Sequence, residues 1–317
     1  MSLEGDANQR WPCLYRWLPR DGRRHFFRPG DYAWADDVYD RFEELLASIE
    51  SVSPVGLPQK RRTFREERRP DNLLTLRSEL LTGYLLARGG VDFSCPAFPD
   101  FVCSGRFTGG VEVTTRTKND REAIELRLRE LANPEQLSIK VEGGGPVLGQ
   151  ALVDRVVEES KPLLEGGRGG RLTYANTDLR VSIGRVIDTS IDLNEVVAGW
   201  RKELDLCVAQ LPGIILGKAE QAAKTTSALS RPLVLLVDAS RFASFGSLVG
   251  PLFLTDTLPR LAAQLVDLEL TPFDALVVAI SNLQTNSYTG VMRRQDGLPE
   301  TSVVQLDILE RVLLSHP

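Results

Sequence analysis

Residues 71–118, DNLLTLRSELLTGYLLARGGVDFSCPAFPDFVCSGRFTGGVEVTTRTK, decide the fold that we expect for this chain. Apolar residues recur at steps of three and four between residues 73 and 86, which predicts an amphipathic helix. Gly89 and Gly90 end the predicted helix, because paired glycines favour a helix terminus. The remainder of the stretch is rich in β-branched, aromatic and turn residues, so we expect a meander of strands after the helix.

The meander is predicted to have three short strands, at residues 91–94, 101–103 and 110–115. We expect glycines to form the turn between the second and third strands, namely Gly105, Gly109 and Gly110. Side chains alternate between the two faces of a strand, so Val111 and Val113 are predicted to enter the core.

Three carboxylates are spaced along this helix and meander, at Glu79, Asp100 and Glu112. Asp100 comes directly before the second strand and Glu112 lies inside its hairpin partner, so the hairpin is expected to place the two groups side by side. Clustered carboxylates repel one another unless a cation lies between them, and Mg²⁺ prefers carboxylate oxygens and water as ligands. The arrangement therefore indicates a metal site for Mg²⁺ or Mn²⁺.

In these features the stretch resembles the PD-(D/E)XK nuclease superfamily. Pro99-Asp100 matches the PD element, Glu112-Val113-Thr114 stands at the (D/E)XK element, and Glu79 lies where many members have a further acid on the first helix. The resemblance implies a restriction-endonuclease-like core of a helix, a three-stranded meander, a second helix and a further strand. It also implies that Asp100 and Glu112 bind the metal, that Glu79 assists, and that the reaction is phosphodiester hydrolysis.

One position departs from the family pattern, because Thr114 stands where the family usually has lysine. Threonine has no positive charge with which to steady an attacking hydroxide. We name three cationic residues that could replace the lysine: Arg116 on the same strand face as Glu112, Lys118 just beyond it, and Lys218 on a later predicted helix. The departure bears on activity more than on fold.

Composition excludes several classes of protein. The chain has 317 residues, with 42% hydrophobic and 26% charged residues, as in an ordinary globular protein. No apolar run approaches the ~20 residues of a membrane helix, and the start of the chain lacks a signal-peptide core, so we expect no membrane and a cytoplasmic protein. The four cysteines are scattered, and with two histidines in the chain a histidine-based triad would rest on His25.

Charge gives a local rather than a global indication of a partner. The net charge of −5 is not that of a protein that coats nucleic acid. Residues 59–69, QKRRTFREERR, nevertheless carry six basic side chains against two acidic ones, just before the predicted core helix. This segment is expected either to contact the phosphates of DNA or RNA or to form a solvated linker or helix face, and a protein partner in a complex is a further possibility.

The rest of the chain supplies helices and buried strands. Residues 36–50 and 194–226 are predicted helices, the second interrupted at Leu211-Pro212-Gly213. The apolar runs at residues 232–237 and 274–280 predict strands buried on both faces. A polar loop is expected at residues 281–297, followed by a closing helix or strand at 306–314.

These patterns predict an α/β fold with a mixed central sheet flanked by helices. We expect an N-terminal arm and helix with the basic segment at residues 1–70, and a nuclease-like domain at residues 71–317 with an inserted β/α region at about 134–192. The expected function is metal-dependent nucleic-acid hydrolysis. The alternative is a catalytically degenerate module of the same fold that serves as a binding or assembly subunit.

Overall fold

The structure is a computed structural model. It describes residues 10–17, 35–52, 55–66, 70–115, 137–142, 150–165, 170–174, 179–185, 193–225, 229–239, 258–282 and 285–314, with helical positions at 124, 128 and 131. The chain divides into two compact units, one formed by Met1–Arg116 with Trp200–Pro317 and the other by Thr117–Gly199. No helix in the described ranges is long and apolar enough to span a bilayer.

The first unit is built on a mixed six-stranded sheet in the order β1-β2-β3-β7-β8-β9. The three strands of the predicted meander pair antiparallel, β3 and β7 then pair parallel, as do β7 and β8, and β9 returns antiparallel to β8. The bounds of the strands are β1 Val91–Ser94, β2 Phe101–Gly105, β3 Gly109–Thr115, β7 Leu233–Asp238, β8 Ala275–Asn282 and β9 Ser287–Arg294. The predicted α/β class with a mixed sheet is confirmed.

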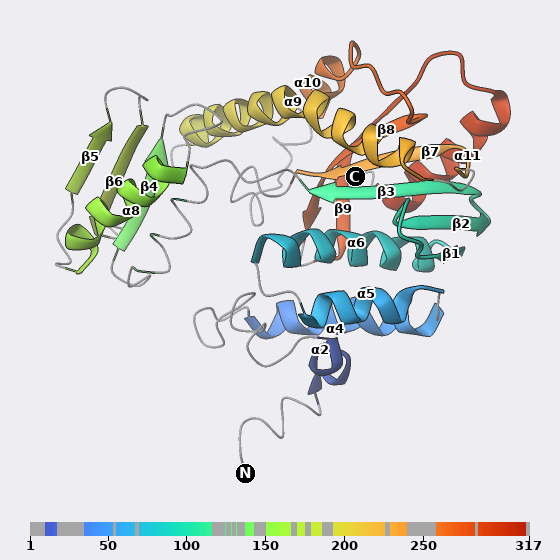
Figure 1. Cartoon of the computed structure of the whole chain (residues 1–317), viewed down its shortest axis with the longest axis horizontal. Helices are drawn as coiled ribbons and strands as arrows, with labels where there is room; N and C mark the ends of the chain where they lie inside the picture. The colour runs from blue at the N-terminus through green and yellow to red at the C-terminus, as the bar shows by residue number, and fades with distance from the viewer. Residues whose placement is uncertain are drawn as a thin grey trace. The chain divides into compact units, whose positions relative to one another are not determined.

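Helices cover both sides of this sheet. Figure 1 shows α6 (Pro70–Arg88) and α9 (Leu193–Ala223) on opposite sides of β3, with α4 (Ala35–Val52) and α5 (Leu57–Glu66) outside α6. α6 packs on β1 and β3 and also contacts α4, α5 and α11 (Glu300–Leu313). Among the described residues, this unit also contains α2 (Pro12–Trp17), which packs on α4 and α5, and α10 (Leu258–Gln264), which packs on β9.

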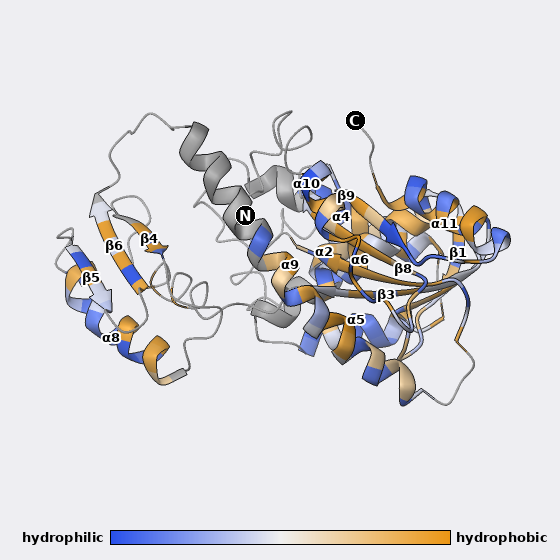
Figure 2. Ribbon diagram, turned by 90° about the horizontal axis from the view of Figure 1, so that it is seen from above, coloured by the Kyte–Doolittle hydropathy of each residue, from blue (hydrophilic) through white to orange (hydrophobic). Residues whose placement is uncertain are grey.

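Burial follows the predicted alternation and the apolar runs. Val111 and Val113 of β3 are buried in the core beneath α6, as their place on the strand predicts. All six residues of β7 are buried, because helices cover both faces of this central strand. Figure 2 shows orange, hydrophobic stretches among the strands of this sheet.

The predicted turn at Gly109 and Gly110 is wrong, since both glycines lie in β3. Their role is close packing: a Cβ atom on Gly109 would come within 2.5 Å of the Pro232 carbonyl oxygen. Of the three glycines, Gly105 alone shows turn geometry, with a φ of 79° at the end of β2.

Two later predictions are also corrected. α9 runs without a break through Pro212, because the helix buries Leu211 and Ile215 while Pro212 and Gly213 face solvent, so packing outweighs one lost backbone hydrogen bond. The polar loop expected at residues 281–297 contains the strand β9, whose polar residues suit the half-exposed edge of the sheet and whose Tyr288 is buried.

The second unit has its own sheet and core. Its strands β4 (Leu137–Glu142), β5 (Gly170–Tyr174) and β6 (Leu179–Arg185) are antiparallel in the order β4-β6-β5. Apolar residues of α8 (Gln150–Glu165) pack with those of the strands in a separate core cluster. That this region is an insertion into a nuclease core stays a prediction.

Candidate active site

Asp100 and Glu112 lie opposite one another on neighbouring strands. β2 pairs with β3 so that Phe101 faces Val111, and one further step in this register brings Asp100 beside Glu112. The Asp100 backbone N–H donates to Glu112 Oε2 at 3.0 Å, and the Val113 N–H donates to Asp100 Oδ2 at 3.0 Å. These reciprocal hydrogen bonds fix both carboxylates to the strand backbone, so the predicted proximity is confirmed.

Lys218 of α9 contacts Glu112. α9 and α6 lie on opposite sides of the sheet, so Lys218 approaches from the side away from α6. Its ammonium donates to Glu112 Oε1 at 2.6 Å and to Gln221 Oε1 at 3.4 Å. The Glu112 side chain is 3% exposed, and a carboxylate so deeply buried stays ionised only with a close cation or strong hydrogen bonds. The structure therefore joins Glu112 to one of the three cations named as substitutes for the missing lysine.

Lys60 of α5 is a member of the site that the sequence reasoning missed. Its ammonium bridges Glu79 Oε2 at 2.7 Å and Asp100 Oδ1 at 2.9 Å, and lies 5.3 Å from the centre of the Phe101 ring. Lys60 belongs to the basic segment 59–69, where we expected phosphate contacts or a solvated face. A usable signal was present, because Lys60 shares a helical face with the buried Leu57 and Phe64.

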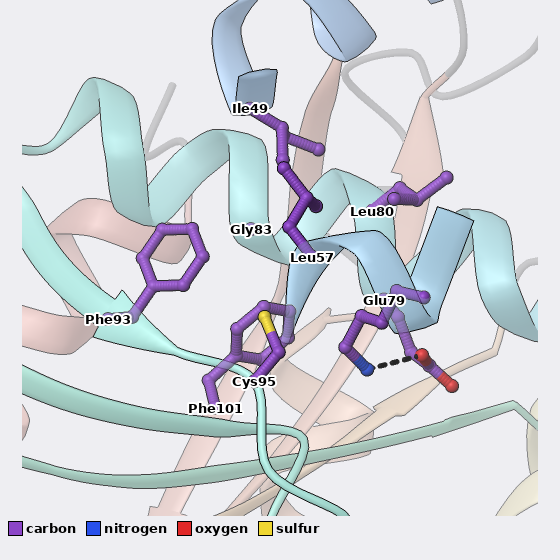
Figure 3. A pocket seen from close by; sticks show the side chains of 9 residues that line it. Ile49, Leu57, Glu79, Leu80, Gly83, Phe93, Cys95 and Phe101 are labelled. Atoms are coloured by element: carbon purple, nitrogen blue, oxygen red, sulfur yellow. Dashed lines mark hydrogen bonds and ion pairs between the residues drawn. The ribbon is translucent and has the colours of Figure 1, made fainter. Parts of the chain in front are cut away.

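Figure 3 shows this region, with the ion pair to Glu79 drawn as a dashed line. Glu79 lies at one end of a small pocket, which Lys60 also lines. The rest of its lining is mostly apolar and comes from α4, α5, α6, β1 and β2, with the residues Ile49, Leu57, Leu80, Gly83, Phe93, Cys95 and Phe101. This lining suits packing behind the site better than the binding of a phosphate.

The charged groups form one connected row, from Lys218 through Glu112, Asp100 and Lys60 to Glu79. Three carboxylates and two ammonium groups leave a formal charge of −1 when all are ionised. Burial, followed by the charge of Asp100, raises the pKa of Glu79 and of Glu112 to about 7. Burial acts to lower the pKa of Lys60, but Asp100 and Glu79 outweigh it and hold that pKa above its ordinary value, so Lys60 stays charged.

Of the remaining predicted residues, Thr114 is described and is not part of this row. Thr114 lies two residues beyond Glu112 on β3, and its hydroxyl donates to the adjacent Thr115 carbonyl at 3.4 Å. Arg116 and Lys118 lie outside the described residues. Among the described residues, Lys218 is the proposed replacement for the lysine that contacts a carboxylate.

We next consider which of the three carboxylates could bind one divalent ion together. In the described part of the chain, no three His, Cys, Asp or Glu side chains group as ligands of one ion, so Glu79 does not converge with the other two carboxylates. Asp100 and Glu112 each accept two hydrogen bonds of the roughly four that a carboxylate accommodates. Their remaining lone pairs are hard oxygen donors of the kind that Mg²⁺ and Mn²⁺ prefer. These lone pairs are compatible with one ion on Asp100 and Glu112, which would lie beside the ammonium groups of Lys60 and Lys218.

No family model, no curated protein and no solved structure matches this chain.

Proposed function

We propose that this chain is a metal-dependent, nuclease-like protein that hydrolyses phosphodiester bonds in nucleic acid. The observation that carries the proposal is the pair Asp100 and Glu112, held side by side with the Lys218 ammonium on Glu112. The order of elements supports it: the helix α6, the meander β1-β2-β3, the helix α9 and the strand β7 parallel to β3 follow the core that the resemblance to the PD-(D/E)XK superfamily implies.

Each side chain of the pair has a distinct task in this proposal. Asp100 and Glu112 would hold Mg²⁺ or Mn²⁺ through their remaining lone pairs, while the backbone N–H groups keep them in place. A bound divalent ion supplies a water of lowered pKa and a positive charge at the scissile phosphate. Lys218 adds the charge that Thr114 lacks, because its ammonium is already oriented by Glu112.

A second candidate function is favoured by Lys60. Since Lys60 already bridges Glu79 and Asp100, part of the carboxylate charge is neutralised without a metal. Such internal neutralisation is sufficient for a nuclease-like module that has lost catalysis and binds DNA, RNA or a protein partner, because this module needs no metal ion. The two candidates differ in one observable, since the module binds its partner without cleaving it.

Cleavage of a substrate panel tests the proposal. Single-stranded DNA, duplex DNA and RNA are incubated with Mg²⁺ or Mn²⁺ and the wild type, Glu112→Gln or Glu142→Gln. Glu142 is the matched control, because it lies on β4 in the other unit and pairs with Lys140 at 2.8 Å. We expect the wild type and Glu142→Gln to cleave at least one substrate, and Glu112→Gln to be slower by at least about 100-fold, the size of effect expected when an essential charge is removed.

Two outcomes contradict the proposal. If Glu112→Gln, shown to be folded by its circular dichroism, cleaves as fast as the wild type, the activity does not arise at this site. If the wild type binds a nucleic acid of the panel and cleaves none, the binding module is the better description.

A further inference from the structure

The Lys60 ammonium lies between two part-buried carboxylates, those of Glu79 and Asp100. The side chains of Lys60, Glu79 and Asp100 are 13%, 13% and 14% exposed, so their charges are poorly screened by solvent. Two such carboxylates repel one another, and an ammonium at 2.7 and 2.9 Å from their oxygens offsets that repulsion. A metal ion bridging Glu79 and Asp100 would compete with the Lys60 ammonium, which already lies between them and contacts one oxygen of each.

The backbone that presents Lys60 is firmly held. On the same face of α5, Phe64 is fully buried, and its ring packs against Trp17 of α2 and Phe42 of α4, with ring centres 6.1 and 6.2 Å apart. The neighbouring Arg61 lies 3.6 Å from Glu50 of α4. The Phe101 ring borders the ammonium on a further side. Lys60 is therefore built into the site rather than resting against it from a free surface.

We infer that the Lys60 ammonium permanently occupies the position between Glu79 and Asp100, as the resident cation there. The site therefore binds one divalent ion, on Asp100 and Glu112, and not two. This inference rests on the proposed function for the ion at Asp100 and Glu112. Glu79 is then a positioning residue, which orients the Lys60 ammonium toward Asp100 and does not bind the metal. The residual charge of the row, formally −1, suits a single added cation better than a pair of them.

Counting bound Mn²⁺ tests the inference without relying on activity. Free Mn²⁺ is measured by electron paramagnetic resonance during titration of the wild type, Lys60→Met and Arg62→Met. Arg62 is the matched control on α5, because it is exposed and bonds to the neighbouring Gln59. We expect one ion on the wild type and on Arg62→Met. Lys60→Met should bind a second ion, or the first at least about tenfold more tightly, because two carboxylates lose their cation.

The outcomes separate this inference from the proposed function. Two ions on the wild type, or identical binding by Lys60→Met and the wild type, would overturn the inference and leave the metal site standing. Binding by Lys60→Met alone would uphold Lys60 as the resident cation and refute metal-dependent activity of the wild type. Binding by none of the three proteins would overturn both.

Two further measurements apply if Lys60→Met fails to fold. The double variant Lys60→Met with Glu79→Gln removes one carboxylate together with the lysine, and we expect it to fold and bind one ion; two ions would overturn the inference. In the wild type, acetic anhydride should label Lys60 far more slowly than Lys140, whose side chain is 68% exposed, and equally slowly with Mn²⁺ present. Labelling of Lys60 that accelerates on Mn²⁺ addition would show that the ion displaces it.

Discussion

At the scale of single residues, the site contains a carboxylate, Glu112, whose burial disfavours its ionised form. Glu112 is 3% exposed and depends on two hydrogen bonds, from Lys218 and from the Asp100 backbone, to remain a carboxylate. Such a group costs folding stability when it ionises, and this cost is expected where a side chain is retained for chemistry rather than for stability.

The pH dependence of stability should reveal this cost. The pKa of Glu112 is raised from 4.5 to about 7 by burial, so between these values the folded protein holds a proton that the unfolded chain has released. Stability therefore falls as the pH rises through this window. We expect the free energy of unfolding of the wild type, relative to Glu112→Gln, to fall by roughly 1–3 kcal/mol from pH 5 to pH 8.

Urea denaturation at several pH values measures this difference. Lys140 lowers the pKa of Glu142, the control residue, so Glu142→Gln should track the wild type over the same window. A difference between the wild type and Glu112→Gln that is independent of pH would contradict the argument.

The sequence was sufficient for some site residues and not for others. Asp100 and Glu112 were predictable as neighbours, because a short hairpin leaves few registers. The contact of Lys218 with Glu112 was a hypothesis from its helix face, and it required the packing of α9 on the sheet to be known. Lys60 is not predicted, because the overall charge of segment 59–69 does not show which of its basic residues shares a helical face with the buried Leu57 and Phe64.

At the scale of elements, local pattern predicts where β3 lies but not how closely it is packed. Its bounds, Gly109–Thr115, nearly match the predicted strand, and the buried run of β7 was predictable from its uniform hydrophobicity. The need for glycine at the start of β3 comes from a residue far along the chain, the carbonyl of Pro232. The local sequence pattern does not reveal a contact with so distant a residue. The pattern around Gly109 therefore predicts a turn.

Substitution of Gly109 tests this packing argument. A Cβ atom there would lie 2.5 Å from the Pro232 carbonyl oxygen and 2.7 Å from the Phe107 ring, so β3 or its neighbours must shift. We expect Gly109→Ala to lower the free energy of unfolding by about 1–3 kcal/mol. Gly213 of α9 is the control, because a Cβ atom added there would meet no atom within 4 Å, and Gly213→Ala should stabilise the helix by up to ~1 kcal/mol. Equal effects of the two substitutions would contradict the argument.

At the scale of the whole molecule, the first unit brings together described residues that are far apart in the chain. Its core contains Trp17 near the start and Leu313 near the end, along with the strands between them. α6, which carries Glu79, is anchored by residues far away in sequence: Ser78 Oγ donates to Asp238 Oδ2 at 2.6 Å, and Tyr288 Oη donates to the Ser78 carbonyl at 2.9 Å. The class of fold was predictable from the sequence, whereas contacts over such separations follow only from the assembled sheet.

Diffraction at the manganese absorption edge, from crystals of the wild type grown with Mn²⁺, tests the central claim most directly. We predict one anomalous peak, at bonding distance from the carboxylates of Asp100 and Glu112, with Lys60 still bridging Glu79 and Asp100. A peak coordinated elsewhere, or no peak at a saturating concentration of Mn²⁺, would contradict the claim that these two carboxylates form the metal site of a nuclease-like protein.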